Sequence, residues 1–253
     1  MKRLEGKTAL ITGGNSGVGE ATAILFAQEG ANVLIAARRE KPLKKVAEKI
    51  QEAGGSVLAL CGDISNPEDS VTLVSRAVET FGGLDILVNN AGVRDKALQP
   101  VDKVDDSEID RVVDINTKGT MYCIRAALKE MLKNKKGSII NMASSAGVNG
   151  GGGSAYVASK AAILGITKHT ALRCAKSSVR CNALCPSMIM TPMAETTGEN
   201  MDSEMMEALV THSDLSLPAC SAEDVANSIL FLASDASAPI TGQCIILDYG
   251  SSL

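Results

Sequence analysis

Three side chains near the middle of the chain have the types and the spacing of a proton-transfer unit. Tyr156 and Lys160 are four residues apart, and Ser144 lies upstream of both. Four residues make about one helical turn, so the phenol and the ammonium would project from the same face of a helix. A positive charge beside a phenol favours its ionised form. We therefore expect Tyr156 to transfer a proton and Lys160 to lower its pKa.

The charge of one lysine has the right size for this effect. A free tyrosine titrates near 10, so work at neutral pH needs a fall of roughly three units, about 4 kcal/mol. A positive charge about 4 Å away supplies roughly that much at an effective dielectric constant of about 20. A Tyr-x-x-x-Lys pair also occurs on ordinary amphipathic helices. The elements that would position the pair must therefore decide between the two interpretations.

A glycine-rich loop near the N-terminus indicates a nucleotide-binding element. Residues 7–11 form an apolar run typical of a strand, the loop follows at 12–19, and an alanine-rich helical stretch covers 20–29. Strand, glycine-rich turn and helix in this order are the context of a phosphate-binding loop, in which the first N–H groups of the helix face the phosphates. The alternative is an ordinary strand-to-helix turn.

Three glycines of the loop have expected roles. Gly13 permits the tight turn, Gly17 lets the backbone approach a pyrophosphate, and Gly19 lets the helix pack close to the strand. We expect further contacts to the nucleotide from the other loop residues, Asn15, Ser16 and Val18.

The rest of the chain alternates between strand and helix patterns. Strands are predicted at 32–37, 56–61, 84–88, 138–142, 179–185 and 244–247, and helices at 40–53, 67–81, 105–134, 155–176 and 222–233. This alternation predicts an α/β fold of three layers, in which helices cover both faces of a parallel sheet. Ligands of such sheets bind at the carboxyl ends of the strands. With no internal repeat or linker, we expect a single domain over residues 1–253.

The composition is that of a soluble enzyme. The net charge of −4 does not favour nucleic acid as a partner. The apolar runs are of strand length, so we expect neither a transmembrane helix nor a signal peptide. The seven cysteines are scattered without a C-x-x-C motif, as in a cytoplasmic protein with reduced thiols. Cys181 and Cys185 lack partner ligands, so we expect no metal site.

The motifs and their order resemble the short-chain dehydrogenase/reductase family over essentially the full length. The residues that carry the resemblance are the loop at 12–19, Asp63, the run Asn89-Asn90-Ala91-Gly92, Asn116, Ser144, Tyr156-x-x-x-Lys160, and Pro186 with Thr191. The resemblance implies a Rossmann-like, doubly wound sheet of about seven strands. It also implies an enzyme that moves hydride between a nicotinamide cofactor and a carbonyl or alcohol.

The resemblance implies a role for each catalytic position. Ser144 would hydrogen-bond the substrate oxygen, and Tyr156 would transfer the proton. Lys160 would lower the pKa of Tyr156 and bind the nicotinamide ribose. Asn116 lies inside a predicted helix, where asparagine is a poor helix former. There it would kink the helix and hold a water that joins Lys160 to a proton relay.

The cofactor contacts carried over from the family extend along the chain. Asp63 would hydrogen-bond the adenine amino group, although it could instead cap the helix that Pro67 begins. Further contacts are implied for Ile64, Asn90, Ala91 and Gly92 on the adenosine side, and for Pro186, Ile189 and Thr191 on the nicotinamide side.

Arg38 and Arg39 follow the second predicted strand, where an acidic residue would bind a ribose 2′-hydroxyl. Guanidinium groups suit a 2′-phosphate, so we predict NADP(H) rather than NAD(H). The two arginines could instead simply begin a solvated basic helix. Ser16 stands where NADP-preferring relatives often carry a second basic residue, which weakens the prediction without removing it.

The segment 191–217 is the expected substrate lid and is rich in methionine, which adapts to apolar shapes. This favours a bulky apolar alcohol or ketone such as a hydroxysteroid, unless the methionines are simply core of a lid helix. A 3-oxoacyl thioester on an acyl carrier protein is an alternative, docked by Arg94 and Lys96. Two further alternatives are an NAD-preferring alcohol or sugar dehydrogenase and a non-catalytic dinucleotide sensor.

The helices predicted at 105–134 and 155–176 carry more small and apolar residues than one sheet contact would bury. In the family these two helices pair across a twofold axis, and the C-terminal strand forms a second interface. We therefore expect a homotetramer, with a homodimer as the second possibility.

Overall fold

The computed structural model describes residues 2–190, 201–211, 214 and 216–252. It contains one parallel sheet of seven strands in the order β3-β2-β1-β4-β5-β6-β7, which confirms the predicted Rossmann-like α/β fold. The strands are β1 (Thr8–Thr12), β2 (Asn32–Ala37), β3 (Ser56–Cys61), β4 (Ile86–Asn89), β5 (Gly137–Met142), β6 (Val179–Pro186) and β7 (Cys244–Leu247).

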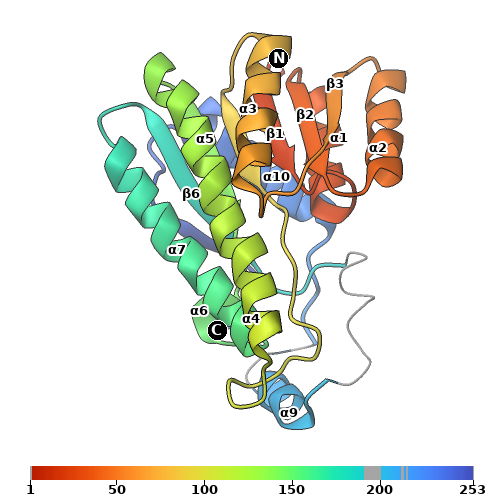
Figure 1. The fold of residues 1–253 in the computed structure, drawn as a ribbon, viewed down its shortest axis with the longest axis vertical. Helices are drawn as coiled ribbons and strands as arrows, with labels where there is room; N and C mark the ends of the chain where they lie inside the picture. The colour runs from red at the N-terminus through yellow and green to blue at the C-terminus, as the bar shows by residue number, and fades with distance from the viewer. Residues whose placement is uncertain (1, 191–200, 212–213, 215, 253) are drawn as a thin grey trace.

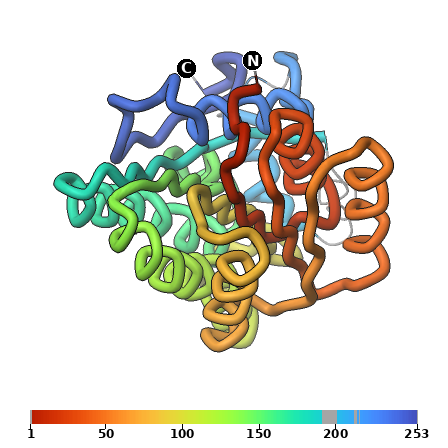
Figure 2. The backbone as a smooth tube through the Cα atoms, turned by 90° about the horizontal axis from the view of Figure 1, so that it is seen from above, coloured from red at the N-terminus to blue at the C-terminus, as the bar shows by residue number. Residues whose placement is uncertain are grey.

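Helices cover both faces of the sheet. On one face lie α1 (Gly17–Gln28), α2 (Glu40–Glu52) and α10 (Ala222–Ala233), and on the other lie α3 (Pro67–Phe81), α5 (Gly119–Asn134) and α7 (Ser154–Cys174). Figure 2 shows α3, α5 and α7 along one side of the molecule and α1 and α10 along the other. Each face has its own apolar core, so the sheet forms the middle of three layers.

Local sequence accounts for these elements. All five residues of β1 are buried, as expected of a strand covered on both faces. The buried side chains of α2 recur at helical spacing: Leu43, Val46, Ala47 and Ile50. The N-cap of α3 is Asn66, whose side chain accepts the Glu68 N–H at 3.0 Å. The alternative role for Asp63, capping this helix, is therefore wrong.

The helix predicted at 105–134 has a different internal structure. It consists of α4 (Asp106–Val112), a π-helical segment η1 (Val113–Lys118) and α5. The resemblance implied a kink at Asn116, and the structure has a π-helical segment there, a form that the sequence pattern did not predict and that accompanies a contact with a distant segment. The buried Asn116 side chain accepts the Val93 N–H and donates to the Val93 carbonyl, both at 2.8 Å. Such π-helical turns frequently occur at functional sites.

Short helices gather beyond the carboxyl ends of the strands. Figure 1 shows α4, α6 (Ala146–Asn149) and α9 (Ser203–Thr211) at the lower end of the molecule. Asp202, just before α9, donates its N–H to the Ala97 carbonyl at 3.0 Å and pairs with Lys103 at 2.8 Å.

A short 3₁₀ helix, η2 (Asp235–Ser237), follows α10. None of the described helices is long and apolar enough to span a membrane.

Candidate active site

A groove of about 810 Å³ opens at the carboxyl ends of the strands, beside the point where the strand order changes between β1 and β4. The structure brings most of the predicted site residues to its walls. They are Gly13, Asn15, Ser16, Gly17, Val18, Arg38, Arg39, Asp63, Ile64, Asn90, Ala91, Gly92, Ser144, Tyr156, Lys160, Pro186 and Ile189. Gly19 and Asn116 do not line the groove, and Thr191 lies outside the described residues.

The glycine loop forms one end of the groove. Gly13 and Gly17 have φ values of +67° and +54°, which a glycine adopts without strain. A Cβ at Gly13 would lie 2.8 Å from Asn90 Nδ2 and 2.9 Å from Ala91 Cα. The N-cap of α1, Ser16, makes no side-chain hydrogen bond to the helix, so the first N–H groups of α1 have no side-chain cap. A glycine-lined helix N-terminus of this kind fits the pyrophosphate of a dinucleotide.

Arg38 and Asp63 lie together at the ends of β2 and β3. The Arg38 Nη1 atom is 3.9 Å from Asp63 Oδ2, and both side chains are partly exposed. Asp63 Oδ1 accepts hydrogen bonds from the N–H and the hydroxyl of Ser65. One carboxylate oxygen is thus used to hold the loop, while the other faces a guanidinium at the groove wall.

Lys160 is buried at the centre of the site, with 5% of its surface exposed. Its ammonium donates to the Met142 carbonyl at the end of β5, at 2.7 Å. Burial lowers the pKa of Lys160 to about 8. A Cβ at Gly92 would lie 3.4 Å from Lys160 Nζ, so the loop that follows β4 packs directly against the lysine.

The pKa of Tyr156 departs from the predicted direction, in which Lys160 lowers it. Burial, not a neighbouring cation, dominates and raises the pKa of Tyr156. A hydrogen bond with Ser144 and the charge of Arg94 act in the opposite direction, and Asp95 adds to the rise. Lys160 Nζ is 5.6 Å from the centre of the phenol ring and is directed at the Met142 carbonyl. The Lys160 ammonium is thus anchored to the end of β5.

Ser144 and Asn116 are fixed by the elements around them. The Ser144 hydroxyl accepts the Ala146 N–H at 3.2 Å and is 3.5 Å from the Pro186 carbonyl. Asn116 Nδ2 donates to Ser159 Oγ at 2.9 Å, and Ser159 donates in turn to the Tyr156 carbonyl at 2.8 Å. The π-helical segment is thus connected to the first turn of α7, which carries the tyrosine.

Several groove residues were not predicted as site residues. Sequence reasoning considered Arg94 only as a docking residue and did not consider Asp95 or Arg111, which also line the groove. For Arg94 and Asp95, the available signal was their position shortly after the Asn-Ala-Gly run. The sequence alone could not show that the Asp95 side chain is buried against the start of α7.

The chain is similar to known proteins over nearly its whole length. Residues 13–252 match the protein family described as Enoyl-(Acyl carrier protein) reductase. Oxidoreductase UcpA of Escherichia coli (strain K12) is 39% identical over 100% of this chain and 97% of its own. The 3beta-hydroxysteroid dehydrogenase 2 of Eggerthella lenta is 36% identical over 98% of this chain and 96% of its own.

Two solved structures share the fold. The crystal structure of levodione reductase superposes with a TM-score of 0.91 at 30% identity and covers 99% of both chains. A short-chain type dehydrogenase/reductase from Mycobacterium ulcerans gives a TM-score of 0.89 at 30% identity, covering 98% of this chain and 90% of the other.

Proposed function

The chain belongs to the short-chain dehydrogenase/reductase family, and on this premise we propose that it moves hydride between NADP(H) and a bulky apolar secondary alcohol or ketone. The protein is an oxidoreductase that acts on alcohol or carbonyl groups. The observation that carries the proposal is the gathering of Ser144, Tyr156 and Lys160 at a glycine-lined groove.

Each side chain of the site has its own role in the proposed reaction. When bound, the nicotinamide cofactor supplies or accepts the hydride. Tyr156 gives a proton to the substrate oxygen in reduction and takes it back in oxidation, while the Ser144 hydroxyl holds that oxygen. Because burial raises the pKa of Tyr156, its phenol is protonated at neutral pH, which is the form that reduction requires. Lys160 would hold the nicotinamide ribose, and Asn116 would hold the relay water.

The remaining cofactor contacts follow from the groove walls. The α1 N-terminus and the loop from Gly13 would hold the pyrophosphate. Asp63 would hold the adenine, and Ile189 with Thr191 would hold the carboxamide. A sensor without turnover would not need Ser144, Tyr156 and Lys160 together, so their gathering supports an enzyme.

Arg38 is proposed to select NADP(H), and its replacement tests this. We expect Arg38→Gln to raise the KM for NADPH about tenfold or more, because a charge-assisted hydrogen bond is worth about 1.5–3 kcal/mol. The KM for NADH should change little. Steady-state kinetics with both cofactors measure the effect, and Lys44→Gln, which removes an exposed cation paired with Glu40, is the control. A wild type that prefers NADH would favour the alternative of an NAD-dependent alcohol or sugar dehydrogenase.

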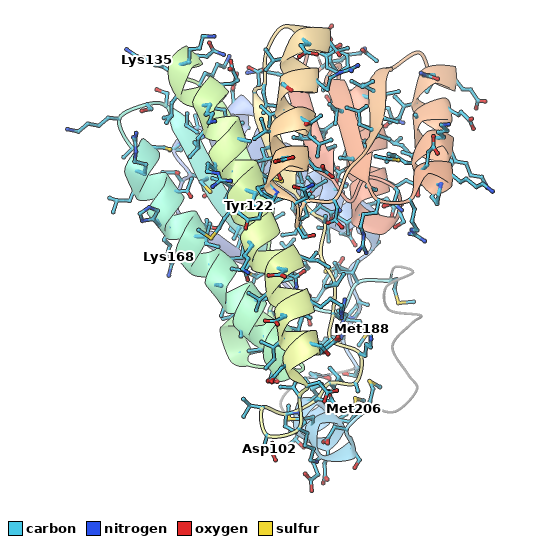
Figure 3. All side chains as sticks on the ribbon, in the orientation of Figure 1. Asp102, Tyr122, Lys135, Lys168, Met188 and Met206 are labelled. Carbon is cyan, nitrogen blue, oxygen red and sulfur yellow. The ribbon has the colours of Figure 1, made fainter. Side chains whose placement is uncertain are left out.

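The proposed substrate class rests on apolar side chains near the groove. Met188 and Met190 flank the groove residue Ile189 and are 56% and 70% exposed. Met205 and Met206 lie on α9, which has no buried residue among those described. Figure 3 shows Met188 and Met206 at the same end of the molecule. We propose that 191–217 is a lid and that these methionines contact a bulky apolar substrate such as a hydroxysteroid.

A panel of substrates tests the proposed function. The loss of NADPH absorbance should be followed with steroid ketones, small polar ketones, sugars, quinones and an acetoacetyl thioester. Turnover of steroid or other bulky ketones is expected. Turnover of the thioester alone would favour the 3-oxoacyl carrier-protein alternative, which the description of the matching family and the cations Arg94, Lys96 and Arg111 in the groove also support. Turnover of small polar ketones alone would refute the apolar substrate.

The cellular location is proposed from the cysteines. All seven are free thiols, and five of them are buried. Unpaired thiols persist in reducing compartments, which supports a cytoplasmic enzyme.

The assembly is proposed from an apolar groove of about 720 Å³ on the outer faces of α5 and α7. Its walls include Met121, Leu128, Leu132 and Ile166. We propose that a second copy covers this face, and that exposed Phe231 on α10 and Ile246 on β7 contribute to a second interface of a homotetramer.

Met121→Glu should therefore yield smaller particles than the wild type in light scattering, because it buries a charge at the proposed interface. Met121 is 50% exposed in the single chain, so its loss leaves the core intact. The control is Val101→Glu, at an 81% exposed valine of the β4–α4 loop. A wild-type monomer would contradict the proposed assembly.

A further inference from the structure

The segment 93–96, which follows the Asn-Ala-Gly run, is held at both ends and in its middle. Asn116 binds both the N–H and the carbonyl of Val93. Arg111 Nη2 donates to the Arg94 carbonyl at 2.7 Å, and Glu108 Oε1 accepts the Lys96 N–H at 2.9 Å. Because α4 and η1 supply all of these partners, the segment is a fixed part of the groove wall. We call it the clamped arm.

The clamped arm places a buried carboxylate at the start of α7. Asp95 is 5% exposed, and its Oδ2 lies 3.5 Å from the Tyr156 N–H nitrogen. Its Oδ1 is buried and has no hydrogen-bond partner among the described residues. The N-cap of α7 is Gly153, and a Cβ there would overlap the Asp95 carboxylate. The carboxylate thus occupies the position of a capping group, although it comes from a different element.

The preceding residue of the clamped arm, Arg94, lies near the ring of the same tyrosine. Arg94 Cζ is 5.9 Å from the centre of the Tyr156 ring, close to the 5.6 Å that separates the ring from Lys160 Nζ. Adjacent residues of one fixed segment therefore bring a cation to the ring of Tyr156 and an anion to its backbone.

We propose that Arg94 and Asp95 are positioning residues for Tyr156: Asp95 holds the first turn of the catalytic helix, and the two opposite charges together set the electrostatic environment of the phenol. This inference rests on the proposed role of Tyr156. It assigns the pair a role in setting the pH at which the enzyme works.

Polar and charged groups from several elements face Tyr156 and Asp95. Tyr156 is faced by Ser144, Lys160, Arg94 and Asp95. Asp95 is faced by Arg94 on its own segment and by Glu108 and Arg111 from α4. Burial raises the pKa of Asp95, with Arg94 and Arg111 opposing it. In the alkaline range where a tyrosine titrates, Asp95 is ionised, so its charge raises the pKa of Tyr156 while that of Arg94 lowers it.

The two charges predict shifts of opposite sign. Asp95→Asn keeps the shape but removes the anion, so the pKa of Tyr156 should fall by about 0.5–1 unit. Arg94→Gln removes the cation, so the pKa should rise by a similar amount, and Arg94→Lys should restore most of the wild-type value. The matched control is Asp102→Asn, which removes an anion from the tip of the same loop, labelled in Figure 3.

Two measurements separate this inference from the proposed function. The first is a tyrosinate absorbance titration, in which the signal of each Tyr156→Phe double variant is subtracted to isolate one of the three tyrosines. It needs no substrate, so it tests the inference even if the substrate panel gives no turnover. The second is the pH profile of kcat/KM, which should shift in the same directions as the titration.

The outcomes are distinct. Opposite shifts for Arg94→Gln and Asp95→Asn support the inference. Shifts of the same sign, or profiles that coincide with those of Asp102→Asn, overturn it. If Asp95→Asn fails to fold, Arg94→Gln and its rescue by lysine still test the charge effect. Gly153→Ala, which would displace the carboxylate, should then lower kcat far more than Gly83→Ala, where nothing lies within 4 Å of the added methyl group.

Discussion

Tyr156→Phe is expected to lower kcat/KM by roughly 10²- to 10⁴-fold, the range typical of losing a general acid–base group. The change removes only the hydroxyl, and the ring stays packed at the start of α7 beside Lys160 and Arg94. The affinity for the reduced cofactor should change by less than about threefold, because no phosphate contact is altered. Steady-state kinetics and calorimetric titration of NADPH measure the two quantities.

Tyr122→Phe is the matched control for this prediction. Tyr122 lies on α5 (Figure 3), with Arg125 Cζ 5.1 Å from the centre of its ring. It is not part of the groove wall. It should retain wild-type turnover. If Tyr156→Phe also retained it, the proton-transfer role of Tyr156 would be wrong, whichever substrate is used.

Gly19→Ala is expected to destabilise the fold by about 3 kcal/mol, at the upper end of what overpacking usually costs. A Cβ at Gly19 would overlap the Gly13 carbonyl oxygen and lie 2.6 Å from Asn90 Nδ2. Both are fixed, because Asn90 Nδ2 donates to the carbonyls of Thr12 and Gly13 at 3.0 and 3.2 Å. Relief of the overlap requires α1 to move away from β1, so cofactor affinity should fall at least about tenfold. Urea unfolding and NADPH titration measure the two effects.

The control for the second prediction is again Gly83→Ala. Nothing lies within 4 Å of a Cβ at Gly83, and its φ is not in the left-handed region. Its stability should stay close to that of the wild type. Equal stability of Gly19→Ala and Gly83→Ala would show that close packing of α1 on the loop is not needed.

The fold was predictable because its signals are local. Buried strands read as apolar runs and helices as periodic ones, so the bounds predicted for β2, β3, β7, α3 and α10 agree with the structure. The arrangement of the glycine loop before α1 and of Tyr156 and Lys160 on one helix also follows from short segments. These features depend little on where distant parts of the chain lie.

The features that could not be predicted depend on distant partners. The π-helical turn results from hydrogen bonds between Asn116 and Val93, far apart in sequence. The direction of the Lys160 ammonium depends on the Met142 carbonyl at the end of another strand. The burial that raises the pKa of Tyr156 likewise comes from surrounding elements, and spacing in the sequence cannot reveal it.

The π-helical segment also fixes the rotational phase of the long helix that follows it. A π-helical turn accommodates one residue more than an α-helical turn, and one residue corresponds to about 100° of rotation. All side chains of α5 are therefore rotated relative to those of α4 by the turn that Asn116 stabilises. This rotation directs Cys123, Ala127 and Met131 into the core and leaves Met121 on the outer surface. The geometry beside the catalytic helix and the choice of which residues α5 presents outward are thus set by the same turn.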